Sequence, residues 1–281
     1  MEFVSASTLI KRAHRERYGI ASFCVWNAES CDAALNAASK LRAPVLLMAS
    51  RTEFSMLSPR KLARVARTVA SDYEVPAALH LDHGASIDEV KECLDAGFTS
   101  VMLDFSTRPF EENIAALRAV VEMARPYGAS VEGELGHVGR ADNDTSEGHG
   151  ASALTDPATA GRFVRETGID MLAVSIGNAH GHYSALPRLR FDLLAEIQKA
   201  AEIPLVLHGG SGTPPEDVQR AIQLGICKIN VASDLCTAIR SSLQSQWTAP
   251  SWLPSTMGVA MAATAPVLER WITAVGSAGK A

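Results

Sequence analysis

The chain has 281 residues, of which 47% are hydrophobic and 20% charged, and its formal net charge is −5. This composition is typical of globular proteins, and without a long Lys/Arg run it argues against binding to nucleic acid or to an anionic membrane surface. The five cysteines are scattered without a CxxC pair, which argues against a thiolate zinc site. With neither a signal peptide nor a membrane-spanning apolar run evident, we expect a cytoplasmic protein.

Eight short aliphatic runs alternate with amphipathic stretches along the chain. The runs, which we predict to be β-strands, are 19–26, 44–50, 77–84, 100–106, 130–136, 171–177, 204–210 and 226–233. Several are apolar on both faces, as strands buried between two layers must be. The predicted helices between them are 31–41, 59–73, 87–97, 110–128, 156–168, 191–202 and 214–225.

Strands that alternate with helices in this way predict an α/β fold, the (β/α)8 or TIM barrel, as a single domain over residues 1–281. A doubly wound open sheet is the alternative, but the chain has no GxGxxG fingerprint to favour it. Residues 137–155 are polar and Gly-rich and unusually long for a loop between a strand and a helix, so we expect a flexible active-site loop there. After about residue 234 we expect C-terminal helices.

Histidines follow three of the predicted strands, at the end of the barrel where TIM-barrel active sites form. His83 ends the third strand in HLDHG, His180 follows the sixth in GNAHG, and His208 ends the seventh in HGG. Three imidazoles suit Zn²⁺, with a fourth position open to water or substrate. Three unrelated hydrogen-bonded histidines are the alternative, but the shared placement favours a metal site. We expect His80, earlier in HLDHG, to pack inside the barrel.

Carboxylates lie at the same strand ends. Asp82 points away from His83 if the third strand stays regular, and is then a candidate general acid or base, or a residue that orients an imidazole. Asp104 and Glu134 end neighbouring strands and offer oxygen ligands for a second or mobile metal position. Asp142 lies in the predicted flexible loop, where it is either carried over a bound substrate or simply solvated.

Two turns after the seventh and eighth strands indicate a phosphate site. In HGGSGTPPED (208–217), a Gly-rich turn leads into a helix N-terminus, where free N–H groups favour an anion. In KINVASD (228–234), the strand is followed by Ser233 and Asp234. Phosphate sites after these two strands recur in unrelated TIM barrels. Asn27 and Ser50, at the ends of the first two strands, are further candidates for substrate binding.

The sequence closely resembles the class II, zinc-dependent ketose-bisphosphate aldolases, on the fructose- and tagatose-bisphosphate aldolase side. The matching stretches run in order over nearly the whole chain and include HLDHG, AGFTSVMLDFS, VEGELGHVG, LAVSIGNAHG, PLVLHGGSGTP and AIQLGICKINVASDL. The resemblance implies a TIM barrel, a homodimer or homotetramer, and one catalytic Zn²⁺ held by His83, His180 and His208. Glu134 and Asp104 match positions of alternative or second metal sites in the family.

The resemblance also implies a reaction of carbohydrate metabolism, of the glycolytic type. A phosphorylated ketose, either fructose or tagatose 1,6-bisphosphate or a related ketose 1-phosphate, is cleaved reversibly to dihydroxyacetone phosphate and an aldehyde. Asp82 matches the residue that moves the proton of the C4 hydroxyl. Five positions match those that bind the ketose 1-phosphate in the family: Gly181, Gly209, Ser211, Asn230 and Ser233. Some of these positions also bind a monovalent cation (Na⁺ or K⁺) in the family. Gly210, next to Gly209, is a further candidate for this site.

Two stretches depart from the family pattern. The family loop usually reads Gly-Gly and then a Glu-rich run, whereas here Gly139 precedes Arg140, and Asp142 aligns with the catalytic glutamate, one methylene shorter. Residues 249–262 have no Arg or Lys, although many relatives carry a basic segment there for the far phosphate. A second phosphate is therefore held by another cation, such as Arg51 or Arg140, or is absent. Another metal-dependent phosphosugar lyase or isomerase, and a non-catalytic phosphosugar-binding homologue, stay open as alternatives.

Overall fold

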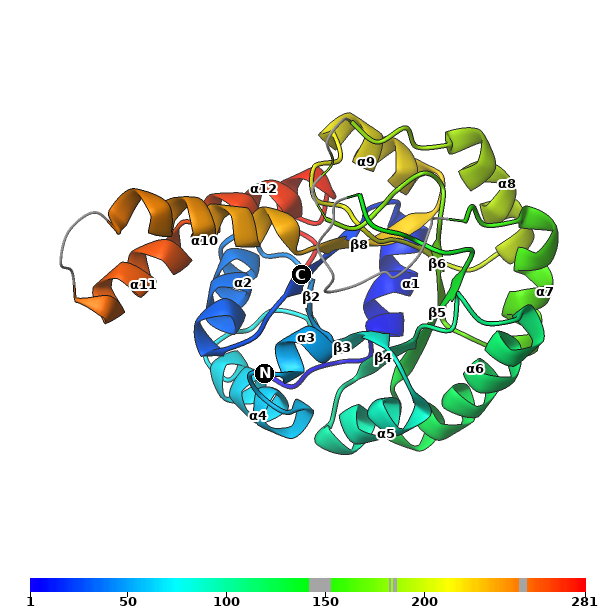
Figure 1. Cartoon of the computed structure of the whole chain (residues 1–281), viewed down its shortest axis with the longest axis horizontal. Helices are drawn as coiled ribbons and strands as arrows, with labels where there is room; N and C mark the ends of the chain where they lie inside the picture. The colour runs from blue at the N-terminus through cyan, green and yellow to red at the C-terminus, as the bar shows by residue number, and fades with distance from the viewer. Residues whose placement is uncertain (142–152, 182, 184–185, 248–251) are drawn as a thin grey trace.

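The computed structural model describes residues 1–141, 153–181, 183, 186–247 and 252–281, and its centre is a closed barrel of parallel strands that pair in chain order (Figure 1). The strands are β1 Ile20–Cys24, β2 Val45–Ala49, β3 Ala77–Gly84, β4 Ser100–Leu103, β5 Ser130–Leu135, β6 Met171–Val174, β7 Leu205–Leu207 and β8 Ile226–Val231. The predicted TIM barrel is confirmed. Because β1 also pairs with β8, the sheet has no free edge and the open doubly wound alternative is wrong.

Helices surround the barrel and connect successive strands (Figure 1). They are α2 Ala28–Lys40, α4 Pro59–Ala70, α5 Ile87–Ala96, α6 Phe110–Ala124, α7 Pro157–Thr167, α8 Phe191–Ala201 and α9 Pro215–Gln223, with a short α3 at Arg51–Phe54 and a 3₁₀ turn η1 at Arg125–Tyr127. Local chemistry sets their ends. In α5, for example, the Ser86 hydroxyl accepts a bond from the Glu89 N–H, and Gly97 ends the helix in the left-handed conformation.

Helix α1 (Ala6–Glu16) covers the N-terminal end of the barrel, and Figure 1 shows it across the barrel axis. Its buried residues Leu9 and Ile10 pack in one cluster with Ile20 and Leu46, whose side chains fill the barrel interior. This apolar layer closes one end of the barrel. The polar side chains of the interior, His80 and those described below, therefore belong to the C-terminal half, where TIM barrels bind their substrates.

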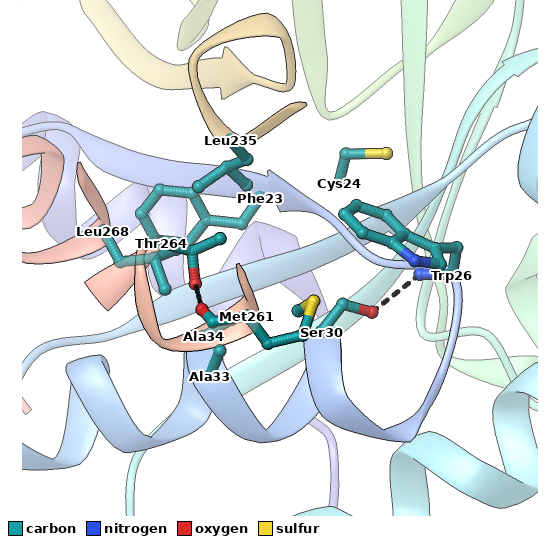
Figure 2. A pocket seen from close by; sticks show the side chains of 10 residues that line it. All are labelled: Phe23, Cys24, Trp26, Ser30, Ala33, Ala34, Leu235, Met261, Thr264 and Leu268. Carbon is teal, nitrogen blue, oxygen red and sulfur yellow. Dashed lines mark hydrogen bonds between the residues drawn. The ribbon is translucent and has the colours of Figure 1, made fainter. Parts of the chain in front are cut away.

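Three helices follow the last strand: α10 Ser233–Gln246, α11 Leu253–Ala262 and α12 Ala265–Ala274. Helices α10 and α11, which we call the C-terminal arm, extend away from the barrel (Figure 1). A small pocket at its base, shown in Figure 2, is lined mainly by apolar side chains of β1, α2 and the three C-terminal helices, among them Phe23, Met261 and Leu268. Among the described residues, no helix combines the length and apolar character that crossing a membrane requires.

Candidate active site

Three histidines from three different strands meet at the C-terminal mouth of the barrel. The ring centroid of His83 lies 4.8 Å from that of His180 and 4.5 Å from that of His208. One nitrogen from each ring lies within 4.8 Å of the other two. The structure thus brings together the three residues that the sequence grouped from their positions at the end of β3 and after β6 and β7.

The donor atoms of these histidines fit a metal ion. His83 Nε2, His180 Nε2 and His208 Nδ1 are buried and have no hydrogen-bond partner among the residues that the structure describes. Buried polar atoms in folded proteins are almost always paired, so three unpaired imidazole nitrogens in one cluster indicate a ligand that is shared among them. Three nitrogen donors with an open fourth position match the coordination of catalytic Zn²⁺.

The imidazoles differ in charge because their neighbours differ. Burial and the surrounding imidazoles lower the pKa of His180, and burial lowers the pKa of His208, so both favour the neutral form that binds metal. Burial also acts to lower the pKa of His83, but Asp82 and Asp104 outweigh it and raise that pKa well above its ordinary value. Metal binding to His83 would therefore release a proton.

His83 reaches the cluster because β3 is irregular at its end. The φ angle of His83 is 45°, and the register between β3 and β4 shifts between Leu81 and Gly84. An irregularity of this kind re-aims a side chain that strict alternation would send to the other face. The regular strand on which the expected separation of Asp82 and His83 depends is therefore absent. Asp82 Oδ1 lies 4.0 Å from Nε2 of the same His208 whose ring packs against His83.

Carboxylates orient two of the histidines. Asp104 Oδ2 lies 2.8 Å from His83 Nδ1, and Glu132 Oε1 lies 2.8 Å from His208 Nε2. Each bond leaves the other ring nitrogen of that histidine free for a metal, as in many metalloenzymes. Burial raises the pKa of Asp104, but the bonds from His83 and Ser106 outweigh it and hold that pKa below its usual range. Asp104 therefore supports His83, although His83, Asp104 and Glu134 also form a second group able to hold a metal.

Glu134 adds an unused oxygen beside the histidines. Its Oε1 accepts a bond from the Val138 N–H at 3.0 Å, whereas Oε2 is buried, lies 3.6 Å from His208 Nδ1 and has no hydrogen-bond partner in the described part of the chain. Burial and the nearby carboxylate of Asp104 raise the pKa of Glu134 to about 8. The position suits a carboxylate that loses its proton when a cation binds next to it.

Asp82 lies under the histidines as a carboxylate. Its Oδ1 accepts a hydrogen bond from Asn230 Nδ2 at 2.8 Å, and the residue is buried. Burial raises its pKa, but the charges of His83, Lys228 and His208, with the imidazole of His80 3.7 Å away, hold it well below its ordinary value. An ionised, fixed carboxylate at the mouth of the barrel is able to accept a proton from a substrate hydroxyl.

Two charged residues below Asp82 were absent from the predicted site. Lys228 Nζ lies 2.8 Å from Glu132 Oε2 and 3.9 Å from Asp82 Oδ1, and both Lys228 and Glu132 are fully buried. Burial raises the pKa of Glu132, but Lys228 and His208 lower it to about 2. The signal for this pair is a charged residue inside each of two largely apolar strands, Lys228 in β8 and Glu132 in β5, since an unpaired buried charge is costly.

His80 has the interior position that the sequence predicted. It is fully buried, and its Nδ1 lies 2.8 Å from the hydroxyl of Ser100 on the neighbouring strand. His80, Asp82 and Glu132 form a third group with metal-binding geometry. The ammonium of Lys228 already supplies a positive charge to both carboxylates of this group, so the histidine cluster is the better metal site.

The loops after β7 and β8 pack closely at the predicted phosphate site. A Cβ at Gly209, whose φ is 63°, would lie 1.9 Å from the carbonyl oxygen of Ala179, and a Cβ at Gly210 would lie 2.4 Å from Ile229. The backbone here approaches its neighbours too closely for a side chain. The Ser211 hydroxyl accepts a bond from the Asp234 N–H at 3.1 Å, which links this loop to the start of α10.

Other predicted residues surround this loop. Gly181 follows His180 with a φ of 87°, and Ser233 is the first residue of α10. The carboxylate of Asp234, however, accepts bonds from Arg270 Nη2 at 2.7 Å and Trp271 Nε1 at 2.8 Å. Its side chain therefore joins α10 to α12, and we do not retain it among the substrate-binding residues.

The side chains after β1 and β2 cap the helices that follow. Asn27 Oδ1 accepts a bond from the Ser30 N–H at 2.9 Å, and the Ser50 hydroxyl accepts one from the Thr52 N–H at 3.3 Å. Their contribution to substrate binding stays a prediction. Asp142 and most of the predicted flexible loop lie outside the described residues.

The described start of that loop runs beside a metal-ligand candidate. The His180 N–H donates to the Gly139 carbonyl at 2.9 Å, and the Ala141 N–H donates to the His180 carbonyl at 2.8 Å. Arg140 lies between these two bonds, so the residue that departs from the family pattern borders the histidine cluster.

Comparisons with known proteins identify the family of the chain. Residues 4–280 match the family model described as Fructose-bisphosphate aldolase class-II. The solved structure of the YdjI aldolase from Escherichia coli K12 is 32% identical, with 100% of each chain covered and a TM-score of 0.89. A proposed fructose-1,6-bisphosphate aldolase from Coccidioides immitis is 27% identical over 98% of this chain and 97% of that one, with a TM-score of 0.89.

The fructose-bisphosphate aldolase of Campylobacter jejuni shares the fold at 22% identity, with a TM-score of 0.85 over 99% of this chain and 97% of that one. The family match spans nearly the whole chain and includes every strand of the barrel. The chain therefore belongs to the class II fructose-bisphosphate aldolase family and is an aldolase of the lyase class.

Proposed function

We propose that the protein is a metal-dependent aldolase that cleaves a phosphorylated ketose reversibly to dihydroxyacetone phosphate and an aldehyde. The observation that carries this proposal is the cluster of three buried histidines with unpaired nitrogens, together with the buried, ionised carboxylate of Asp82, whose Oδ1 lies 4.0 Å from Nε2 of His208. A metal site alone would explain only the binding of a phosphosugar. A fixed carboxylate next to the metal site also supports proton transfer from the bound substrate.

In this proposal His83, His180 and His208 hold Zn²⁺, and Glu134 and Asp104 provide oxygen atoms for an alternative or second metal position. When bound, the ion supplies Lewis-acid stabilisation of the negative charge that develops on the ketose C2 oxygen. The chain itself contributes the imidazole nitrogens that bind the ion. Asp104 and Glu132 set the tautomers of His83 and His208, and the site is buried.

Asp82 is the proposed base. It takes the proton from the C4 hydroxyl, the C3–C4 bond breaks as the C4–O bond becomes a carbonyl, and the aldehyde leaves. The hydrogen bond from Asn230 keeps the carboxylate in place for this transfer. Asp142 is the proposed acid that then returns a proton to C3 of the dihydroxyacetone phosphate half.

The 1-phosphate end of the ketose is proposed to bind at the loops after β7 and β8. Gly209 and Gly210 leave the backbone free of side chains there, and Ser211 links it to the N-terminus of α10. A helix N-terminus and exposed N–H groups favour a phosphate. Gly181, Ser233 and Asn230 complete this proposed site, which also offers oxygen atoms to a monovalent cation such as Na⁺ or K⁺.

The aldehyde half is proposed to differ from glyceraldehyde 3-phosphate. Residues 249–262 carry no Arg or Lys, whereas Arg51 lies at the start of α3 and Arg140 lies beside His180. We expect fructose or tagatose 1,6-bisphosphate and the matching 1-phosphates to be cleaved at comparable rates. Strict dependence on the 6-phosphate would show that this part of the proposal is wrong.

The deciding experiment is a cleavage screen over ketose mono- and bisphosphates, with and without a chelator, that detects dihydroxyacetone phosphate. Chelator-sensitive cleavage supports the proposal. Phosphosugar turnover without dihydroxyacetone phosphate would indicate another lyase or an isomerase, and binding without turnover would indicate a non-catalytic homologue.

The protein is further proposed to form a homodimer or homotetramer in the cytoplasm. The C-terminal arm exposes large apolar side chains, including Trp252 at 76% and Trp247 at 66% of their surface. Apolar patches of this kind usually mark contacts between proteins. Sedimentation analysis of the wild-type protein and of a Trp252→Asp variant tests whether the arm contributes to assembly.

A further inference from the structure

The lower part of the site holds a chain of buried charges that ends at a metal-ligand candidate. Lys228 Nζ on β8 lies 2.8 Å from Glu132 Oε2 on β5, and the other oxygen of that carboxylate, Oε1, lies 2.8 Å from His208 Nε2. All three side chains are fully buried. A hydrogen-bonded chain that is closed to water fixes each member in one orientation.

The orientation of His208 decides whether it is able to bind a metal. A neutral imidazole carries one N–H, and the hydrogen bond made by one nitrogen sets which nitrogen remains as a ligand. Here Glu132 accepts from the Nε2 side, and Nδ1 is the buried atom without a hydrogen-bond partner in the described structure. The carboxylate therefore holds the tautomer in which Nδ1 faces the other two histidines.

Glu132 needs the lysine in order to do this. Its Oε2 also lies 3.5 Å from His80 Nε2, a buried nitrogen with no hydrogen-bond partner among the described residues. Without Lys228, Glu132 would be a buried anion that has lost one partner and has a competing imidazole within reach, and turning toward His80 would replace the lost bond. This change would break the hydrogen bond with His208.

We propose that Lys228 is a positioning residue for the metal site: its ammonium fixes the carboxylate of Glu132, which holds His208 in the Nε2–H tautomer whose Nδ1 binds the metal. This inference rests on the proposed metal site and concerns residues outside the set that binds the ion. In this inference the buried lysine of β8 acts on the metal site through the contact of Lys228 with Glu132 and that of Glu132 with His208.

Three variants test the proposal by zinc affinity of the metal-free protein, measured by competition with a chromophoric chelator. Lys228→Met removes the ammonium, and Lys228→Met/Glu132→Gln replaces the whole ion pair by neutral side chains of similar size, a change that folded proteins often tolerate. Ser100→Ala is the matched control, because Ser100 is equally buried and contacts His80 instead of His208. We expect both Lys228 variants to bind zinc about 10–100-fold more weakly and the control to match the wild type.

The second readout is the tautomer of His208, from long-range ¹⁵N–¹H spectra of histidine-labelled, metal-free protein, with the signal assigned through a His208→Ala variant. The wild type should show the Nε2–H form alone, and the two Lys228 variants a mixture. Wild-type zinc affinity together with an unchanged tautomer in both variants would overturn the inference, even if their melting temperatures fell. A wild-type protein that binds no zinc would instead overturn the proposed function.

Discussion

Replacing Asp82 by asparagine separates the proposed proton transfer from the rest of the site. The new side chain has the same shape and is able to keep the bond to Asn230, which is 2.8 Å in the wild type. Asp82 Oδ1 lies 4.0 Å from His208 Nε2 and makes no hydrogen bond to that histidine, so the metal ligands should remain in place. Loss of a general base costs about 10²–10⁴-fold in rate, or about 3–5 kcal/mol in activation free energy.

Two assays distinguish this effect from general damage. Cleavage is followed by coupling dihydroxyacetone phosphate to its dehydrogenase, and exchange of the C3 proton of dihydroxyacetone phosphate is followed by NMR in D₂O. Exchange needs no transfer at C4, so we expect Asp82→Asn to lose cleavage by about 10²–10⁴-fold and to keep exchange within a few-fold. Asp142→Asn is the matched control and should lose exchange. Equal loss of both reactions in Asp82→Asn, with zinc bound, would refute the assignment of Asp82 as the base.

Further predictions concern the surroundings of the site. The pKa of Glu134 is raised to about 8 in the folded metal-free protein, whereas the unfolded chain releases this proton near the ordinary pKa of 4.5. The folded state therefore binds one more proton between these two values, and the free energy of unfolding should fall as the pH rises from about 4.5 to 8. Glu134→Gln should remove this part of the fall, on the order of a few kcal/mol, in melting experiments across that range; parallel curves would contradict it. Asp104→Asn should weaken zinc binding about 10–100-fold, because the amide no longer selects one tautomer of His83. Gly209→Ala should destabilise the fold and lower its melting temperature, since its Cβ would lie 1.9 Å from the carbonyl oxygen of Ala179; an unchanged melting temperature would show that the loop adapts.

The barrel follows largely from local patterning. Each aliphatic run that predicts a strand forms one, and the helices between them begin and end near the predicted limits. Strands apolar on both faces must lie between two layers, and helices between successive strands force parallel neighbours. The packing of α1 across the barrel end depends on side chains from distant strands, which periodicity does not report.

The grouping of His83, His180 and His208 was also predictable, because the strands of a TIM barrel all end on one face. The direction of a side chain within a strand was not. Regular alternation separates Asp82 from His83, whereas the shift in register before Gly84 directs both toward His208. Such an irregularity arises from contacts between β3 and β4 and leaves little trace in the residues of one strand.

By itself the sequence determined the barrel, the end at which its site lies, and the three imidazoles that meet there, since strand order and strand ends are local properties of the chain. Only the tertiary structure decided which nitrogen of His208 is free and what keeps it so. Lys228 and Glu132 stand 96 residues apart, and their charges become a pair only when β5 and β8 enclose the same dry interior. In water each would be a solvated side chain, but inside the barrel neither is stable without the other.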